Sequence, residues 1–287
     1  MPSRNPRRTW AKPTTSCGYL GKTLTRIIAV ANQKGGVGKT TTTVNLAAAL
    51  AALNERVLLV DLDPQGNATM GSGIDKGALA ASSYHWLVSE QDFARVVQTS
   101  PAHFDVMPSN IDLTAAEVSL LQHQQREFVM RELLAKVVSK YDYVLVDCPP
   151  SLNILTVNAL VTANSVLIPM QCEYYALEGL SALLDTVDGI REQANPHLKI
   201  EGLLRTMYDP RNGLTRDVSR QLIHYFGNQV FRTVVPRNVR LAEAPSHGVP
   251  ILLYDKASRG SLAYQALAAE VRKRNAEEPQ EPTNNNI

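Results

Sequence analysis

The feature that most constrains this chain is a short apolar stretch followed at once by a glycine-rich turn and then by a helical pattern. Residues 27–31 read Ile-Ile-Ala-Val-Ala, and residues 34–41 read Lys-Gly-Gly-Val-Gly-Lys-Thr-Thr. A helix is predicted over residues 40–53, because apolar residues recur there at helical spacing. In a strand–turn–helix unit of this kind, backbone N–H groups converge on an anion at the helix N-terminus. We therefore predict a phosphate-binding loop.

This loop departs at one position from the common phosphate-binding pattern, G-x-x-x-x-G-K-[ST]. Gly38, Lys39 and Thr40 fit the end of the pattern, but Gln33 stands where its first glycine is expected. In the pattern the lysine reaches the β- and γ-phosphates and the hydroxyl ligates Mg²⁺, so Lys39 and Thr40 are the candidates for these roles. A glycine turn without a ligand is the alternative. The loop residues predicted to contact a nucleotide are Lys34, Gly35, Gly36, Val37, Gly38, Lys39, Thr40 and Thr41.

Beyond the loop, apolar runs alternate with helical patterns. Further strands are predicted over residues 57–60, 143–146, 166–168, 200–204 and 230–235, and further helices over residues 126–140, 177–190, 218–226 and 261–274. Residues 114–117 (Thr-Ala-Ala-Glu) have the form of a capping box before another apolar run. Continuous apolar strands alternating with helices predict an α/β fold, with a mostly parallel sheet covered by helices on both faces. We expect a single domain, similar to P-loop NTPases, over residues 25–274.

The two ends of the chain differ in composition from its middle. Residues 1–26 carry six basic residues and no acidic one, so the net charge of +2 for all 287 residues leaves −4 for the rest. Residues 1–24 show no apolar period, and three interpretations are open: a basic arm that contacts DNA, a solvated extension, or a start site assigned upstream of the real one near Leu24. Residues 275–287, rich in Glu, Pro and Asn, are predicted to be a disordered tail.

Cysteine usage and hydropathy exclude several classes of protein. Cys17, Cys148 and Cys172 show no metal-type spacing, which favours buried, inert thiols in a reducing cytoplasm. No apolar run reaches the ~18 residues that suggest a membrane span. The N-terminal segment lacks the apolar core of a secretory signal.

Acidic residues stand at the ends of two predicted strands. Asp61 and Asp63 follow the strand at 57–60, and Asp147 follows the strand at 143–146. Ligands of parallel α/β sheets bind at the carboxyl ends of the strands, so these side chains are expected near the glycine loop. A helix cap or a turn residue is the alternative for an aspartate in such a place.

The loop resembles the deviant Walker A motif of the ParA/MinD group of ATPases. Four further segments resemble the ParA/Soj chromosome-partitioning family: residues 61–68 (DLDPQGNA), 147–151 (DCPPS), 171–179 (QCEYYALEG) and 236–248 (PRNVRLAEAPSHG). The resemblance covers roughly residues 25–274. It implies ATP and Mg²⁺ as cofactors, slow ATP hydrolysis stimulated by a ParB-type partner, and an ATP-dependent homodimer. It also implies binding to non-specific double-stranded DNA of the chromosome or a plasmid, a cytoplasmic, nucleoid-associated location and no membrane association.

The resemblance also implies roles for single residues. Lys34 matches the signature lysine, which crosses a dimer interface to the partner's phosphates and would neutralise charge there as an arginine finger does. A solvated lysine is the alternative. Asp63 matches an aspartate that orients the attacking water, and Asp147 would hold Mg²⁺ through water, whereas the part of Asp61 stays open.

Two further sets of residues follow from the same resemblance. Pro236 and Asn238 match positions that contact the adenine, although a structural turn at Pro236 competes with that interpretation. Arg211 and Arg240 match arginines that contact DNA, and Lys256 and Arg259 could extend their patch; solvated side chains are the alternative. Such binding would be directed at phosphates, sensitive to salt and largely independent of sequence.

Two other functions within the same group are less well supported by the residues. A membrane-associated division-site ATPase like MinD would end in an amphipathic basic helix, but residues 277–282 read Glu-Glu-Pro-Gln-Glu-Pro, which does not suit an anionic membrane. A nitrogenase-type reductase would need two cysteines per chain at cluster-ligand positions. Cys148, directly after Asp147, does not suit that role.

Overall fold

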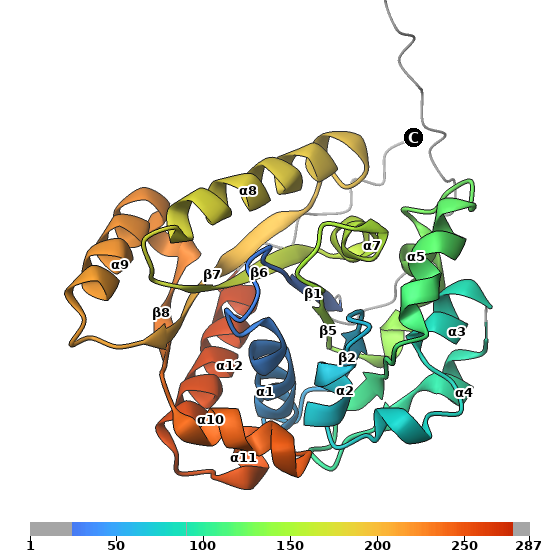
Figure 1. Ribbon diagram of the computed structural model, residues 1–287, viewed down its shortest axis with the longest axis horizontal. Coiled ribbons are helices and arrows are strands. Elements are labelled where there is room, and N and C mark those ends of the chain that lie inside the picture. The colour runs from blue at the N-terminus through green and yellow to red at the C-terminus, as the bar shows by residue number, and fades with distance from the viewer. Residues whose placement is uncertain (1–24, 90, 278–287) are drawn as a thin grey trace, which may run out of the picture.

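The computed structural model describes residues 25–89 and 91–277, and these build an eight-stranded sheet between layers of helices (Figure 1). The strand order is β3-β4-β2-β5-β1-β6-β7-β8, and all neighbours are parallel except β3 and β4. The strands are β1 (Arg26–Val30), β2 (Val57–Asp61), β3 (Gln98–Thr99), β4 (Asp105–Met107), β5 (Tyr143–Asp147), β6 (Ser165–Gln171), β7 (Lys199–Tyr208) and β8 (Val230–Pro236). The predicted α/β class and mostly parallel sheet are confirmed.

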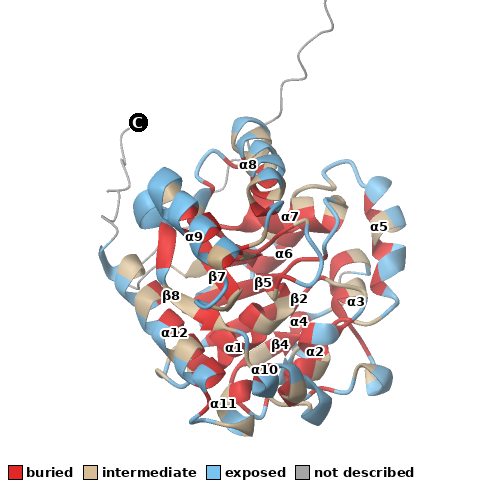
Figure 2. Cartoon of the chain, turned by 60° about the vertical axis from the view of Figure 1, so that its left-hand side comes forward, coloured by how far each residue is buried: buried red, intermediate tan, exposed pale blue. Residues whose placement is uncertain are grey.

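Helices cover both faces of the sheet, as predicted. One face carries α1 (Lys39–Ala51), α10 (Val239–Glu243), α11 (Ile251–Tyr254) and α12 (Arg259–Glu277). The other carries α3 (Ser83–Val88), α4 (Phe93–Val96), α5 (Leu113–Leu121), α6 (Val129–Ala135), α7 (Ile154–Thr162), α8 (Ala176–Gln193) and α9 (Gly213–Phe226). The short α2 (Asn67–Gly71) follows β2. Buried residues concentrate on the strands and on the inner sides of the helices (Figure 2).

The central strands bring the acidic strand ends together. Both β2 and β5 are buried along their whole length, which explains why their sequences read as continuous apolar runs instead of alternating ones. In the register of the sheet, Asp147 lies beside Asp61 on one neighbouring strand and beside Val30 on the other. Since Val30 ends β1, the Asp147 carboxylate lies beside the start of the glycine loop, and Asp61 lies one strand further away.

Two local predictions were wrong. The helix predicted over residues 126–140 is divided into α6 and a 3-10 turn at Val138–Lys140. It begins late because the Asn158 side chain accepts a hydrogen bond from the Met130 N–H and donates one to the Arg126 carbonyl. The capping box at 114–117 does not form either. Helix α5 already begins at Leu113, and the carboxylate of Glu117 accepts a hydrogen bond from Asn153 Nδ2 (2.6 Å).

Other elements were not predicted, or run further than predicted. Helix α7 and the elements between β2 and α5 had no sequence prediction. Helix α12 continues to Glu277, three residues past the predicted domain boundary, while residues 1–24 and the rest of the predicted C-terminal tail lie outside the described residues. Cys148 and Cys172 are free and buried, as expected, and Cys17 lies outside the described part. Among the described helices, none combines the length and apolarity that a membrane span needs.

Candidate functional site

The glycine loop connects β1 to α1 with backbone angles that require glycine. Gly36 has φ +72° and Gly38 has φ +89°, both in the left-handed region, where a side chain is strained. Gly38 is the N-cap of α1, and no side chain in the described part of the chain caps that helix end. The first N–H groups of α1 therefore face the loop without a side-chain partner, as an anion-binding helix start requires.

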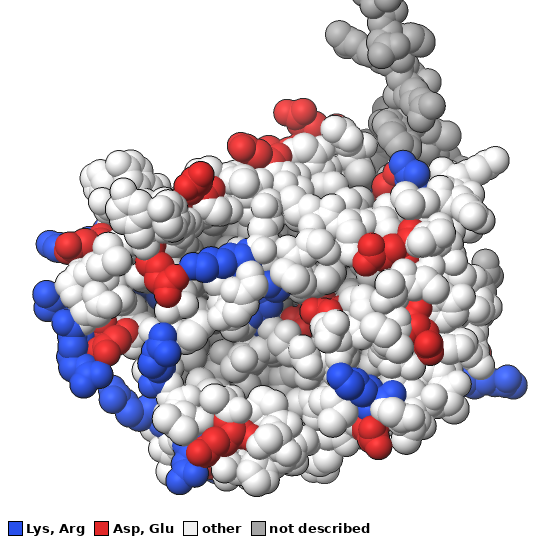
Figure 3. Space-filling model, in the orientation of Figure 1, with Lys and Arg blue, Asp and Glu red and all other residues white. Residues whose placement is uncertain are grey.

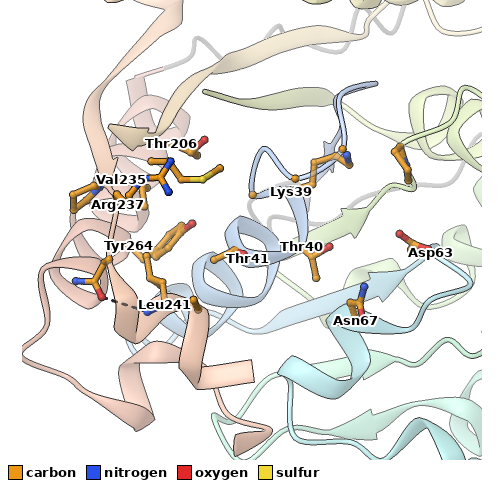
Figure 4. A pocket seen from close by; sticks show the side chains of 18 residues that line it. Lys39, Thr40, Thr41, Asp63, Asn67, Thr206, Val235, Arg237, Leu241 and Tyr264 are labelled. Carbon is orange, nitrogen blue, oxygen red and sulfur yellow. Dashed lines mark hydrogen bonds between the residues drawn. The ribbon is translucent and has the colours of Figure 1, made fainter. Parts of the chain in front are cut away.

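The loop forms one wall of a cavity of about 450 Å³. Figure 4 shows Lys39, Thr40 and Thr41 at its centre, with Asp63 and Asn67 on one side and Arg237, Val235 and Tyr264 on the other. The lining residues are Gly35, Gly36, Gly38, Lys39, Thr40, Thr41, Asp63, Asn67, Pro150, Thr206, Met207, Val235, Pro236, Arg237, Asn238, Leu241, Ala242 and Tyr264. The site thus combines six of the eight loop residues predicted to contact a nucleotide with residues from five other segments.

Lys39 is a buried cation beside this cavity. It is the first residue of α1, it is 7% exposed, and its Nζ donates to the carbonyl of Lys34 (3.1 Å). Burial lowers the pKa of Lys39, while the nearby carboxylates of Asp147 and Asp63 act in the opposite direction. An anionic ligand in the cavity would offset that desolvation further, as the phosphate role predicted for Lys39 requires.

Asp147 lies at the end of β5 and accepts hydrogen bonds from two threonines of α1. Thr40 Oγ1 donates to Asp147 Oδ2 (2.8 Å), and Thr43 Oγ1 donates to Oδ1 (2.9 Å). The carboxylate is fully buried, and burial together with the charge of Asp61 raises its pKa. Mg²⁺ in nucleotide sites is held by one or two protein oxygens plus phosphates and waters, so a hydroxyl beside a carboxylate fits that ion. No cluster of three or more His, Cys, Asp or Glu in the described ranges could hold a metal alone.

Asp61 and Asp63 have separate structural roles. Asp61 is fully buried, and its carboxylate accepts hydrogen bonds from the Thr69 N–H (2.8 Å), the Thr69 hydroxyl (2.7 Å) and the Asp63 N–H (3.1 Å). Asp63 is partly exposed and lines the cavity. Asp61 therefore organises the segment that follows β2, and Asp63 is the one of the two that lines the cavity.

Lys34 is not among the residues that line the cavity. Its Nζ forms a salt bridge with Glu173 Oε2 (2.6 Å), and both side chains are nearly half-exposed. Its N–H donates to Asn32 Oδ1 (2.9 Å), which fixes the backbone from which the side chain leaves the loop. Val37, the other loop residue outside the cavity lining, is buried, and its carbonyl accepts a hydrogen bond from Thr206 Oγ1 (2.7 Å).

The far side of the cavity is built by segments that the sequence marked only in part. Pro236 and Asn238, for which contact with an adenine is predicted, line the cavity there, and Asn238 also caps α10 by accepting from the Leu241 N–H (3.3 Å). Leu241 packs on the first turn of α12, where a Cβ at Gly260 would lie 2.6 Å from Leu241 Cγ. Only glycine at position 260 allows these two helices to approach so closely.

Several lining residues were missed by the sequence reasoning. Thr206 and Met207 lie near the carboxyl end of β7, where an α/β sheet binds ligands, so their position at a strand end was the available signal. Tyr264 of α12 is buried, and its hydroxyl lies 3.2 Å from the Thr42 hydroxyl. A tyrosine within a helical apolar pattern gives no sign in the sequence that it reaches a cavity.

Two of the four candidate DNA-binding residues are close in sequence to residues that line the cavity: Arg211 follows Met207 by four residues, and Arg240 directly precedes Leu241. Arg211 is 89% exposed in the loop before α9 and pairs with Asp209, and Arg240 of α10 pairs with Glu243 (2.9 Å). Lys256 is exposed in the turn before α12, and Arg259 is exposed as the first residue of that helix. In Figure 3, Lys and Arg side chains gather along the margin near α9 and below it. Exposed arginines of that region that were not predicted are Arg216, Arg220 and Arg237.

The geometry defines a class of protein. A glycine loop that offers N–H groups at a helix start, beside a buried lysine and acidic strand ends, is the arrangement of P-loop nucleotide-binding domains. The protein-family model described as "AAA domain" matches residues 25–200.

Relatives identify the family within that class. The chain is 52% identical over 247 residues to the Bacillus subtilis "Sporulation initiation inhibitor protein Soj", covering 86% of this chain and 98% of the relative. It is 50% identical over 253 residues to the Myxococcus xanthus "Chromosome partitioning protein ParA", covering 88% and 89%. A Mycobacterium smegmatis structure described as cobyrinic acid a,c-diamide synthase, with bound ADP and magnesium, aligns with TM-score 0.78 at 36% identity, covering 88% and 96%. The chain belongs to the ParA/Soj family of partitioning ATPases, within the ParA/MinD group.

Proposed function

We propose that this protein is an ATP-dependent DNA-partitioning ATPase that acts on a chromosome or a plasmid. ATP with Mg²⁺ would bring two copies together face to face, the dimer would bind DNA without regard to sequence, and hydrolysis stimulated by a ParB-type partner would release it. This cycle is a nucleotide-driven shift between monomer and dimer. The cytoplasm, on the nucleoid, is where such a protein would act. Membership of the family and the cavity at the glycine loop support the nucleotide part of the proposal.

The chain's own residues supply the chemistry of ATP binding. Gly35 to Thr41 would surround the phosphates with N–H groups, and Lys39 would place its ammonium beside them. Thr40 and Asp147 would hold Mg²⁺, Asp147 through water, and that ion would neutralise charge on the phosphates. Asp63 would orient the attacking water from the side of the cavity opposite the adenine. Pro236 and Asn238 line the part of the cavity where an adenine would lie.

The observation that supports an ATP-dependent dimer is that the Lys34 side chain points away from the cavity of its own chain. Its loop lines the cavity, yet its own ammonium lies with Glu173 outside the cavity lining, about half-exposed. A cation held at the rim of a phosphate site is placed to reach the phosphates of a facing copy. The same lysine would then act in trans, where a second positive charge in the transition state accelerates phosphoryl transfer.

The exposed basic residues support the DNA part. Within residues 25–89 and 91–277, no buried acid pairs with Arg211, Arg240, Lys256 or Arg259, and the acids that pair with Arg211 and Arg240 are themselves partly exposed. Exposed ion pairs of this kind contribute little to stability because water and salt screen them, so phosphate groups of DNA can replace the acidic partners at low cost.

The test compares DNA binding and oligomeric state with a non-hydrolysable ATP analogue and with ADP. We expect the analogue to produce a dimer and to strengthen binding to unrelated DNA sequences, and ADP to do neither. Lys34→Ala should fail to dimerise while still binding nucleotide. Lys136→Ala, which removes an exposed lysine at the C-cap of α6, should behave as wild type. Equal DNA binding in both nucleotide states would refute the proposed cycle.

A further inference from the structure

The backbone of Asp63 is held from both sides by buried side chains. Its N–H donates to Asp61 Oδ1 (3.1 Å), and its carbonyl accepts from Ser109 Oγ (2.8 Å). Asp61 and Ser109 are both fully buried. The peptide groups on either side of Asp63 are therefore fixed, and its side chain is the part that faces the cavity.

Thr69 connects the two residues that hold Asp63. Its hydroxyl donates to Asp61 Oδ2 (2.7 Å) and accepts from the Ser109 N–H (2.8 Å), so one buried oxygen is donor and acceptor at once. The Thr69 N–H adds a second bond to the same carboxylate oxygen (2.8 Å). Asp61, Thr69, Ser109 and Asp63 thus form a closed hydrogen-bond circuit.

The circuit joins three separate elements at the cavity wall. Asp61 ends β2, Thr69 lies in α2, and Ser109 stands two residues after β4. The turn between Asp63 and α2 lies close against this frame, since a Cβ at Gly66 would come within 2.6 Å of the Ser109 carbonyl oxygen. Any shift of α2 or of the end of β4 would therefore displace Asp63.

We propose that Thr69 and Ser109 are positioning residues that hold Asp63 in place against the Thr40–Asp147 pair. This inference rests on the proposed function, because Asp63 has water to orient only if the chain hydrolyses ATP. Neither residue lines the cavity, so both act through Asp63. A misplacement of ~1 Å in an active site can reduce the rate about 100-fold, so a small release of the Asp63 backbone has a measurable effect.

The same helix provides a matched control. Ser72 follows the last residue of α2 and is fully buried like Thr69 and Ser109, but its hydroxyl has no hydrogen-bond partner among the described residues. Removing the Ser72 hydroxyl leaves the circuit intact. Ser72→Ala therefore separates the effect of the circuit from that of a small change in a buried helix.

The experiment measures single-turnover ATP hydrolysis and ATP affinity on the full chain. Ser109→Ala and Thr69→Val should lower the rate about 10-fold to 100-fold while ATP affinity stays within about 3-fold of wild type. Thr69→Ser keeps the hydroxyl and should restore most of the rate, and Ser72→Ala should match wild type. A thermal melt of each variant confirms that it is folded.

Three results would overturn the inference. The first is a wild-type hydrolysis rate in Ser109→Ala, and the second is a Thr69→Ser variant as slow as Thr69→Val. The third is a loss of ATP affinity equal to the loss of rate, which would show a general disturbance of the site. Asp63→Ala separates this inference from the proposed function: if that variant is slow and Ser109→Ala is not, only the positioning role fails. If wild type binds ATP without hydrolysing it, both fail.

Discussion

Breaking the salt bridge between Lys34 and Glu173 should strengthen the ATP-dependent dimer. Both side chains are nearly half-exposed, and exposed ion pairs contribute about 0.2–1 kcal/mol. If Lys34 must leave Glu173 to reach a facing copy, each dimer breaks two such pairs, at a total of about 0.4–2 kcal/mol. Glu173→Gln removes that cost, so the association constant of the dimer should rise about 2-fold to 30-fold.

Sedimentation velocity over a range of protein concentrations, with a non-hydrolysable ATP analogue, measures this constant. Asp217→Asn is the control for the loss of a surface ion pair, because it breaks a pair with Arg220 on α9, away from the glycine loop, that is even more exposed than the pair of Lys34 and Glu173. The control should leave the dimer constant unchanged, and neither variant should alter the melting temperature by more than a few degrees. A Glu173→Gln dimer that is weaker than wild type would refute the reasoning, because Glu173 would then contribute to the dimer and not compete for Lys34.

Three further predictions concern the cavity and the basic surface. Lys39→Ala should abolish binding of a fluorescent ATP analogue while the chain stays folded; retained binding would contradict the phosphate role of Lys39. Because the raised pKa of Asp147 means that the folded state keeps a proton that the unfolded state has lost, wild type should lose stability relative to Asp147→Asn as pH rises from about 5 to about 8. Melting curves across that range check this, and a constant difference between the two proteins would contradict it. Arg240→Ala should weaken ATP-dependent DNA binding equally for unrelated sequences. The slope of the logarithm of the DNA-binding constant against the logarithm of the salt concentration should become shallower by about two per dimer, as anisotropy titrations can measure. A loss of binding confined to one sequence would exclude a phosphate contact.

The sequence predicts the central strands and the loop because their signals are local. A continuous run such as the one ending at Asp61 or Asp147 needs no knowledge of the rest of the chain, since burial on both faces demands apolar side chains at every position. Gly36 and Gly38 likewise follow from the backbone geometry that a phosphate turn needs. These features place the phosphate side of the cavity.

Elements that depend on distant partners could not be predicted. The start of α6 is set by the Asn158 side chain from α7, and the capping box failed because Glu117 bonds to Asn153 instead of to its own helix end. The roles of Asp61 and Ser109 depend on hydrogen bonds to residues far from them in sequence or on other elements. Patterns of apolar residues carry no information about such contacts. The sequence therefore identified Asp61 and Asp63 in this part of the site, but not the residues that bond to them.

The close packing of Leu241 on Gly260 has a thermodynamic consequence. Leu241 lines the cavity and directly follows Arg240, and Gly260 directly follows Arg259. The contact between Leu241 and Gly260 therefore connects the part of the cavity proposed for the adenine to two of the candidate DNA-binding arginines. A displacement of α10 by a bound nucleotide would move both. Linkage then requires reciprocity: if ATP raises the affinity for DNA by some factor, DNA raises the affinity for ATP by the same factor. If the proposed coupling holds, this protein would bind its nucleotide more tightly in the presence of abundant DNA than in dilute solution without it.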